Sequence, residues 1–196
     1  MASLDPLQRA VSELWALLQE REIDFVLVGG IALLQYVGGR NTEDIDLIVP
    51  VSALEQLPEI TITDRNESFA LGRLGELRVV LLLTANPLFA EVMSRYSQPR
   101  VVGEVTIPCA TVEGLLLLKL YALPSLYRSG DFTRVSLYEN DIAALIEAYR
   151  PSLGTLLIEL QGSLSPSDLT EVRSILYDIE RRVERFDSAQ GNHTAS

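Results

Sequence analysis

The sequence predicts an α/β fold, in which a mixed and mostly antiparallel sheet flanked by helices is followed by a C-terminal helical region. Three observations support this prediction. Residues 25–49 read as strand, helix and strand, residues 60–109 hold several short apolar stretches, and helical patterns dominate after residue 110. We expect a core over residues 1–110, helices packed on it over residues 111–186, and a disordered polar tail over residues 187–196.

Length and composition are those of an ordinary globular protein. The chain has 196 residues, of which 47% are hydrophobic and 22% are charged. Its apolar runs are too short to span a membrane, its N-terminus lacks a secretory-signal pattern, and its one cysteine, Cys109, suits a reducing compartment. We therefore expect a cytoplasmic protein with Cys109 in its core. The net charge of −11 argues against a general nucleic-acid binder, although a local basic groove is compatible with it.

The N-terminal segment predicts a helix that packs on the sheet. Asp5 suits an N-cap and Pro6 suits the first helical position. Apolar residues then recur at helical spacing from Leu7 to Leu18. The next apolar run, Phe25 to Val28, is short and β-branched, which predicts a buried strand.

Gly29 and Gly30 follow this strand directly and precede a short helix predicted over residues 31–37. Bare backbone N–H groups and the positive end of a helix dipole make such a junction suited to phosphate. Gly38 then stops the helix, because glycine readily takes the left-handed conformation needed past a C-terminus.

Asp44 and Asp46 lie on one face of the strand that follows and that ends at Pro50. Their Cα atoms are about 7 Å apart, and the two carboxylates repel each other. A hard divalent cation, Mg²⁺ or Mn²⁺, would relieve this repulsion and also hold phosphate. With the glycine pair, these carboxylates predict chemistry on a nucleoside triphosphate. The alternative is a buried strand–helix–strand unit whose acidic strand end is merely solvated.

This pattern resembles the signature of the DNA polymerase β-type nucleotidyltransferase superfamily. The signature has an apolar residue and two glycines, here Val28 to Gly30, and, after thirteen intervening residues, Asp-apolar-Asp-apolar, here Asp44 to Leu47. The longer sequence pattern from Gly30 to Leu47 resembles that of the bacterial branch that includes AbiEii-type toxins and uncharacterised nucleotidyltransferases. The resemblance implies that residues 1–110 are a nucleotidyltransferase core.

The resemblance also implies a Mg²⁺-dependent transfer of a nucleoside monophosphate from a triphosphate to a hydroxyl acceptor. Asp44 and Asp46 would be the catalytic residues and the metal ligands. The toxin-like branch implies RNA, tRNA in particular, or a protein as the acceptor, and an antitoxin as a partner. The residues that would bind the nucleotide are Gly29, Gly30, Arg40, Thr42 and Lys119.

Val80 departs from the family's pattern. Related proteins carry a third carboxylate on a strand beside the paired aspartates, and the stretch from Val79 to Phe89 resembles that strand with Val80 in place of the acid. Glu76 lies roughly 13 Å away along such a strand, so it would complete the site only in a different register. Two functions therefore stay open: an active transferase, or a catalytically weak or inactive protein of the same fold that binds a nucleotide or a protein partner.

Short elements are predicted between the aspartate pair and residue 110. They are a helix over 52–57, a strand over 60–63, two strands over 69–71 and 77–83, a helix capped by Asn86 and running to Tyr96, and a last strand from Arg100 to Cys109.

The C-terminal stretch carries the only lysine of the chain, Lys119, in a nearly all-apolar helix over residues 111–123. Its ammonium must reach water, an acid or an anion, because an unpaired buried charge is costly. A lysine whose stem snorkels to water is the alternative to a phosphate contact. Asp141 resembles the acid of a Lys–Asp pair in related proteins, but Asn140 replaces that lysine, so we expect a surface aspartate.

The remaining segments are predicted from their periodicity and caps. They are a mobile loop over residues 124–133 and helices over 137–149, 153–160 and 169–186, the last with Ser165 as its N-cap.

Overall fold

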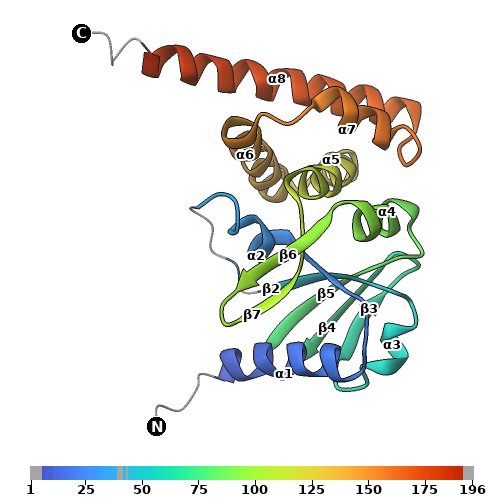
Figure 1. The fold of residues 1–196 in the computed structure, drawn as a ribbon. Helices are drawn as coiled ribbons and strands as arrows, with labels where there is room; N and C mark the ends of the chain where they lie inside the picture. Colours follow the sequence, from blue (N-terminus) through green and yellow to red (C-terminus); the bar gives the residue numbers. More distant parts are fainter. Residues whose placement is uncertain (1–5, 39–41, 43, 192–196) are drawn as a thin grey trace. The chain divides into compact units, whose positions relative to one another are not determined.

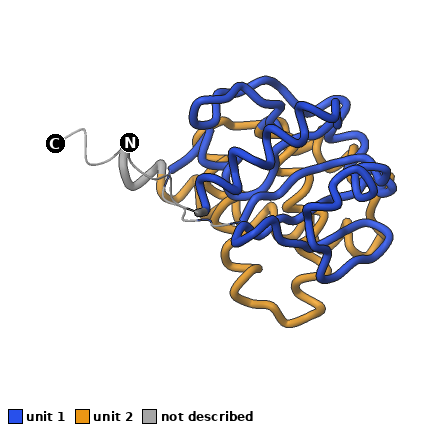
Figure 2. The backbone as a smooth tube through the Cα atoms, turned by 90° about the horizontal axis from the view of Figure 1, so that it is seen from below, with its two compact units in different colours: residues 1–111 blue, residues 112–196 orange. Residues whose placement is uncertain are grey.

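The computed structural model describes residues 6–38, 42 and 44–191, and the chain divides into two compact units (Figures 1 and 2). Unit 1 spans Met1–Thr111 and unit 2 spans Val112–Ser196. In the described part of the chain, no helix is both long enough and apolar enough to cross a membrane.

Unit 1 is built on a sheet that has seven strands within the described residues. The order across the sheet is β3-β4-β5-β2-β1-β7-β6. The β2–β5 and β1–β7 pairs are parallel and the other neighbouring pairs are antiparallel, which confirms the predicted mixed, mostly antiparallel sheet. The strands are β1 (Val26–Val28), β2 (Asp44–Val49), β3 (Thr61–Arg65), β4 (Phe69–Leu74), β5 (Leu77–Leu83), β6 (Ser97–Val102) and β7 (Val105–Ala110).

Helices α1 (Pro6–Glu20) and α4 (Pro87–Arg95) lie on opposite faces of this sheet (Figure 1). Phe89 of α4 packs edge-on against Phe69 of β4, with ring centroids 5.2 Å apart. This contact places α4 over one end of the face that also carries Asp44 and Asp46, because paired residues of neighbouring strands share a face. Two short helices, α2 (Gly29–Leu33) and α3 (Ala53–Gln56), complete unit 1.

Local sequence signals set several of these boundaries. The side chain of Asn86 accepts a hydrogen bond from the backbone N–H of Leu88, and Pro87 occupies the first turn, so α4 begins as predicted. The predicted single strand from Arg100 to Cys109 is wrong. The chain forms the antiparallel hairpin of β6 and β7, because Gly103 takes a left-handed conformation (φ 64°) that reverses the direction.

Unit 2 consists of helices in its described residues. They are α5 (Val112–Ser129), α6 (Phe132–Tyr149), α7 (Leu153–Leu160) and α8 (Pro166–Gly191). The predicted loop over residues 124–133 is wrong, because α5 continues through Pro124, which is buried next to the fully buried Leu123. Burial of this helix outweighs the one backbone hydrogen bond that proline cannot donate.

The start of α8 agrees with the predicted cap, and its end lies further along the chain than the predicted helix. The hydroxyl of Ser165 accepts a hydrogen bond from the backbone N–H of Asp168, as the predicted cap requires. At its other end α8 continues to Gly191, past residue 187, where the sequence predicts the start of a disordered tail. Residues 192–196 lie outside the described part of the chain.

Candidate functional site

Asp44 and Asp46 lie half-buried on one face of β2, while Ile45 and Leu47 point to the other face and are fully buried. The alternation follows from the pleat of the strand, which turns successive side chains to opposite faces. Burial of Ile45 and Leu47 therefore fixes the direction of both carboxylates. β2 lies between β1 and β5, so the carboxylates have a neighbouring strand on each side.

Gly29 brings the backbone of α2 against Asp46. Its φ of 67° is left-handed, and a Cβ atom placed there would lie 1.9 Å from Oδ2 of Asp46. No residue other than glycine fits this position while the aspartate keeps its place. The first glycine of the predicted pair is thus in direct contact with the second aspartate of the predicted motif.

Gly30 makes a similar approach to Thr42. A Cβ atom at Gly30 would lie 2.8 Å from both Cβ and Oγ1 of Thr42. The Thr42 hydroxyl in turn lies 3.5 Å from the backbone carbonyl of Asp44, which is the outer limit for a hydrogen bond. Both glycines, Thr42 and both aspartates are therefore brought together, whereas the predicted Arg40 lies outside the described residues.

Val80 lies beside Asp46 on the parallel strand β5. It is half-buried and shares the face of the two carboxylates, which is where the sequence motif predicts the third acid. Glu76 lies in the exposed turn before β5 and does not take this place. Accordingly, no group of three or more His, Cys, Asp or Glu side chains suited to a metal exists among the described residues.

Arg78 is a member of this site that sequence reasoning missed. It pairs with Asp44 across β5 and β2, and its Nε atom lies 3.4 Å from Oδ1 of Asp44. The Arg78 side chain is 65% exposed, so the ion pair is open to solvent. Its position two residues before Val80 was the available signal, since residues i and i+2 of a strand share a face.

Lys119 lies in unit 2, where its ammonium is 2.7 Å from Oδ2 of Asp141 and 4.4 Å from the ring centroid of Tyr138. Lys119 and Asp141 are 5% and 7% exposed. The lysine therefore meets an acid instead of snorkelling to water, and the predicted surface location of Asp141 is wrong. The pair joins α5 to α6 across 22 positions of sequence, a separation at which local patterns carry no information.

Cys109 is fully buried in β7, as predicted for a core residue. Burial raises the pKa of its thiol to about 11, against a smaller opposing effect of the Arg100 charge. A thiol with this pKa is protonated at neutral pH and is not a nucleophile.

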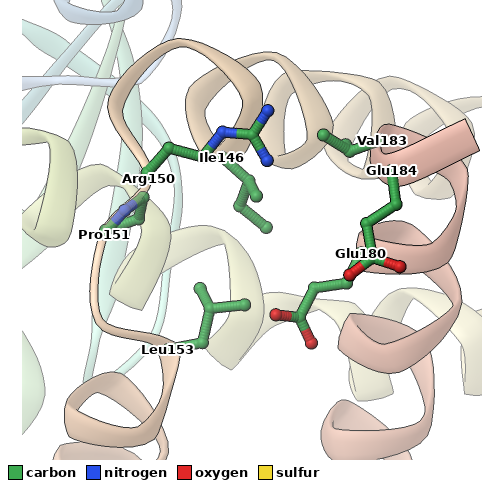
Figure 3. Close-up of a pocket in the computed structure, with 7 residues that line it drawn as sticks. All are labelled: Ile146, Arg150, Pro151, Leu153, Glu180, Val183 and Glu184. Atoms are coloured by element: carbon green, nitrogen blue, oxygen red, sulfur yellow. The ribbon is translucent and has the colours of Figure 1, made fainter. Parts of the chain in front are cut away.

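A shallow pocket in unit 2 lies between the end of α6, the start of α7 and α8 (Figure 3). Ile146 and Leu153 are apolar parts of its lining, and Arg150, Glu180 and Glu184 carry charges around it. None of the residues that the sequence motif singles out is part of this lining. The candidate site of unit 1 is therefore defined by its motif residues and not by this pocket.

Comparisons with known proteins bear on the fold. No protein-family model and no curated protein sequence matches the chain. Among solved structures, an antigenic nucleotidyltransferase-like protein from Paracoccidioides brasiliensis matches with 18% identity and a TM-score of 0.55, over 87% of this chain and 93% of that one.

The antibiotic-resistance factor ANT(2")-Ia matches in two structures. Its solution structure is 17% identical with a TM-score of 0.54, over 98% of this chain and all of that one. Its crystal structure in complex with adenylyl-2"-tobramycin is 12% identical with a TM-score of 0.51, over 85% and 96% of the two chains. The resemblance to the AbiEii-like branch stays a prediction, while the similarity to these structures shows that the chain has a nucleotidyltransferase fold.

Proposed function

We propose that this protein binds a nucleoside triphosphate with Mg²⁺ and transfers its nucleoside monophosphate to a hydroxyl acceptor. The observation that carries the proposal is the contact between Gly29 and Asp46. It joins the backbone suited to phosphate to the carboxylate suited to a cation, as nucleotidyl transfer requires. The similarity to nucleotidyltransferase-like structures supports the same reaction class.

Asp44 and Asp46 fit a magnesium or manganese ion by their chemistry. Both are hard oxygen donors, and they lie half-buried on one face of β2. A cation bound there neutralises phosphate charge and lowers the pKa of a bound hydroxyl. The two aspartates themselves hold negative charge in a fixed place, because β2 is anchored by buried neighbours on both sides.

The remaining residues would orient the triphosphate. Gly29 and Gly30 have no side chains of their own, and their backbone N–H groups would donate hydrogen bonds to the phosphates. Thr42 lies against Gly30 and adds a hydroxyl. The resemblance alone would assign both Arg40 and Lys119 to the phosphates as cations. Because Lys119 already forms a buried ion pair with Asp141 within unit 2, we assign this role to Arg40 only.

A binding function with weak or absent transfer is the second candidate, and Val80 favours it. Valine supplies no oxygen beside Asp46, so the site has two carboxylates where the resemblance implies three. Such a protein would hold a nucleotide or a protein partner, an antitoxin among them. For an active enzyme, we propose as acceptor RNA, tRNA in particular, a protein, or a small molecule, as the adenylyl-2"-tobramycin of the ANT(2")-Ia complex suggests. We propose a cytoplasmic location, where nucleoside triphosphates are available.

Replacing Asp46 with Asn tests the metal and nucleotide site. Mg²⁺ with a non-hydrolysable triphosphate at about 100 times its Kd should stabilise the parent protein by about 2.7 kcal/mol, a shift of several degrees in Tm. Asp46→Asn should abolish this shift without unfolding the protein, whereas Asp64→Asn, an exposed change on β3, should retain it. An undiminished shift in Asp46→Asn would remove this carboxylate from the site.

Replacing Val80 with Asp separates the two candidate functions. The new carboxylate would lie beside Asp46, and the half-buried position has access to solvent. We expect transfer of labelled nucleotide to rise by about 100-fold or more, the lower end of the range for one positioned acid–base group. Leu71→Asp is the matched control. Leu71 pairs with Val80 from β4, on the side of β5 away from Asp46, and is 40% exposed. Fast transfer by the parent, with no gain in Val80→Asp, would show that the site needs no third acid.

A further inference from the structure

Two arginines lie directly opposite each other on the site face of the sheet. Arg73 of β4 pairs with Arg78 of β5, and Arg78 pairs with Asp44 of β2, so the three side chains form one row across the sheet. Both arginines are exposed. Like charges directly opposite on neighbouring strands destabilise a sheet, so the pair has a cost that an anion would remove.

The contacts within the row neutralise at most one of the two positive charges. Arg78 makes a solvent-open ion pair with Asp44 at 3.4 Å. Arg73 donates a hydrogen bond of 2.9 Å to the backbone carbonyl of Glu76, which does not neutralise its charge. Two guanidinium groups in register present a fork of N–H donors that suits a phosphate.

The order of the strands bears on whether these arginines face the nucleoside triphosphate or a phosphate of the acceptor. Gly29, where the triphosphate is proposed to bind, follows β1 on one side of β2. Arg78 and Arg73 lie on β5 and β4, on the other side of β2. The carboxylates thus separate the glycine backbone from the arginine pair. A group bound by the arginines would therefore reach the carboxylates from the β5 side, opposite the glycines, and in the proposed reaction this side is left for the acceptor.

We infer that Arg73 and Arg78 bind a phosphate group of the acceptor and so select acceptors that carry a phosphate near the reacting hydroxyl. The inference rests on the proposed function and specifies its second substrate. It predicts binding of a phosphate without nucleotide. It also predicts that Asp44 competes with this phosphate for Arg78, because both are anions within reach of one guanidinium.

Calorimetric titration of the full chain with ribose 5-phosphate and with ribose, both without nucleotide, tests the inference. The parent protein should bind ribose 5-phosphate at least about tenfold more tightly than ribose, as a charge-assisted contact implies. The Arg73→Gln/Arg78→Gln double variant should lose this preference. Arg65→Gln should keep it, because Arg65 pairs with Ala70 and lies on the opposite face of the same sheet. Asp44→Asn should strengthen phosphate binding severalfold by releasing Arg78.

Three results would overturn the inference. The first is equal binding of ribose and ribose 5-phosphate by the parent, and the second is unchanged ribose 5-phosphate binding in the double variant. The third is a loss of Mg²⁺–triphosphate affinity in the double variant as large as its loss of ribose 5-phosphate affinity, which would assign the arginines to the triphosphate.

A short oligoribonucleotide extends the test. Arginine-dependent binding much tighter than that of ribose 5-phosphate identifies a nucleic-acid phosphodiester, and similar binding identifies a small phosphorylated acceptor; both support the inference. Failure of the parent to bind Mg²⁺–triphosphate would instead refute the proposed function, and the phosphate titrations are read independently of it.

Discussion

Replacing Lys119 with methionine should destabilise the protein by about 3–5 kcal/mol, the cost of removing one partner from a buried ion pair. The ammonium lies 2.7 Å from Asp141, and both side chains are almost completely buried. Methionine keeps the apolar stem, so the loss comes from the charge and not from packing. Thermal unfolding should show a fall in Tm on the order of 10 °C for a chain of this length.

Two further variants make this result specific. Lys119→Met/Asp141→Leu removes both charges and should recover most of the lost stability, because a buried ion pair is often replaceable by apolar residues. Arg128→Met breaks a more exposed pair with Asp168 in the same unit and should cost only about 0–1 kcal/mol. A Lys119→Met variant as stable as the parent would contradict the burial of this pair.

The double variant also isolates any role of Lys119 toward nucleotide. If it is stable and its affinity for Mg²⁺–triphosphate is unchanged, Lys119 serves the packing of α5 and α6 alone. If it is stable and binds nucleotide at least about tenfold more weakly, the ammonium also serves the phosphates.

Replacing Gly29 with alanine should have the second large effect, at about 3–4 kcal/mol. The estimate combines the cost of a left-handed conformation for a residue with a Cβ atom and the cost of a steric overlap in a packed region. The overlap is with Oδ2 of Asp46, at 1.9 Å, so the new methyl group displaces this carboxylate. The variant should therefore also lose the stabilisation by Mg²⁺–triphosphate.

Gly75→Ala is the matched control for this prediction. Gly75 has a similar left-handed φ of 58°, but a Cβ atom there meets nothing within 4 Å. It should cost only about 1–2 kcal/mol, the conformational part of the effect. The difference between the two variants, measured by chemical denaturation, reports the contact with Asp46. Equal costs would show that Asp46 moves aside freely, which would undermine the proposed coupling between glycine and carboxylate.

The motif region of unit 1 was predictable because its signals are local. The apolar strand, the glycine pair and the alternation around Asp44 and Asp46 each follow from a few consecutive residues. The placement of Val80 beside Asp46 is non-local, and only the resemblance to a known family pointed to it. Arg78 was missed because its one sequence signal, a place two residues before Val80 on the same strand face, gains meaning only when its neighbour Asp44 across the sheet is known.

The errors arose where local and tertiary signals conflict. Pro124 ends a helix by its own chemistry, yet burial of α5 carries the helix past it. Asn140 replaces the lysine of the Lys–Asp pair that the resemblance implies, which favoured a surface aspartate, but α6 places Asp141 against Lys119 of α5. A charge with a buried partner cannot be recognised when that partner is 22 positions away.

The state of Cys109 has a practical consequence for labelling this protein. With a pKa of about 11 and full burial, the natural thiol is almost entirely protonated and shielded at neutral pH. A cysteine introduced at an exposed position has an ordinary pKa near 8.5 and would react with maleimide or a spin label far faster. Since the sequence contains no other cysteine, fluorescent or paramagnetic probes can be attached at chosen sites without first removing the native thiol.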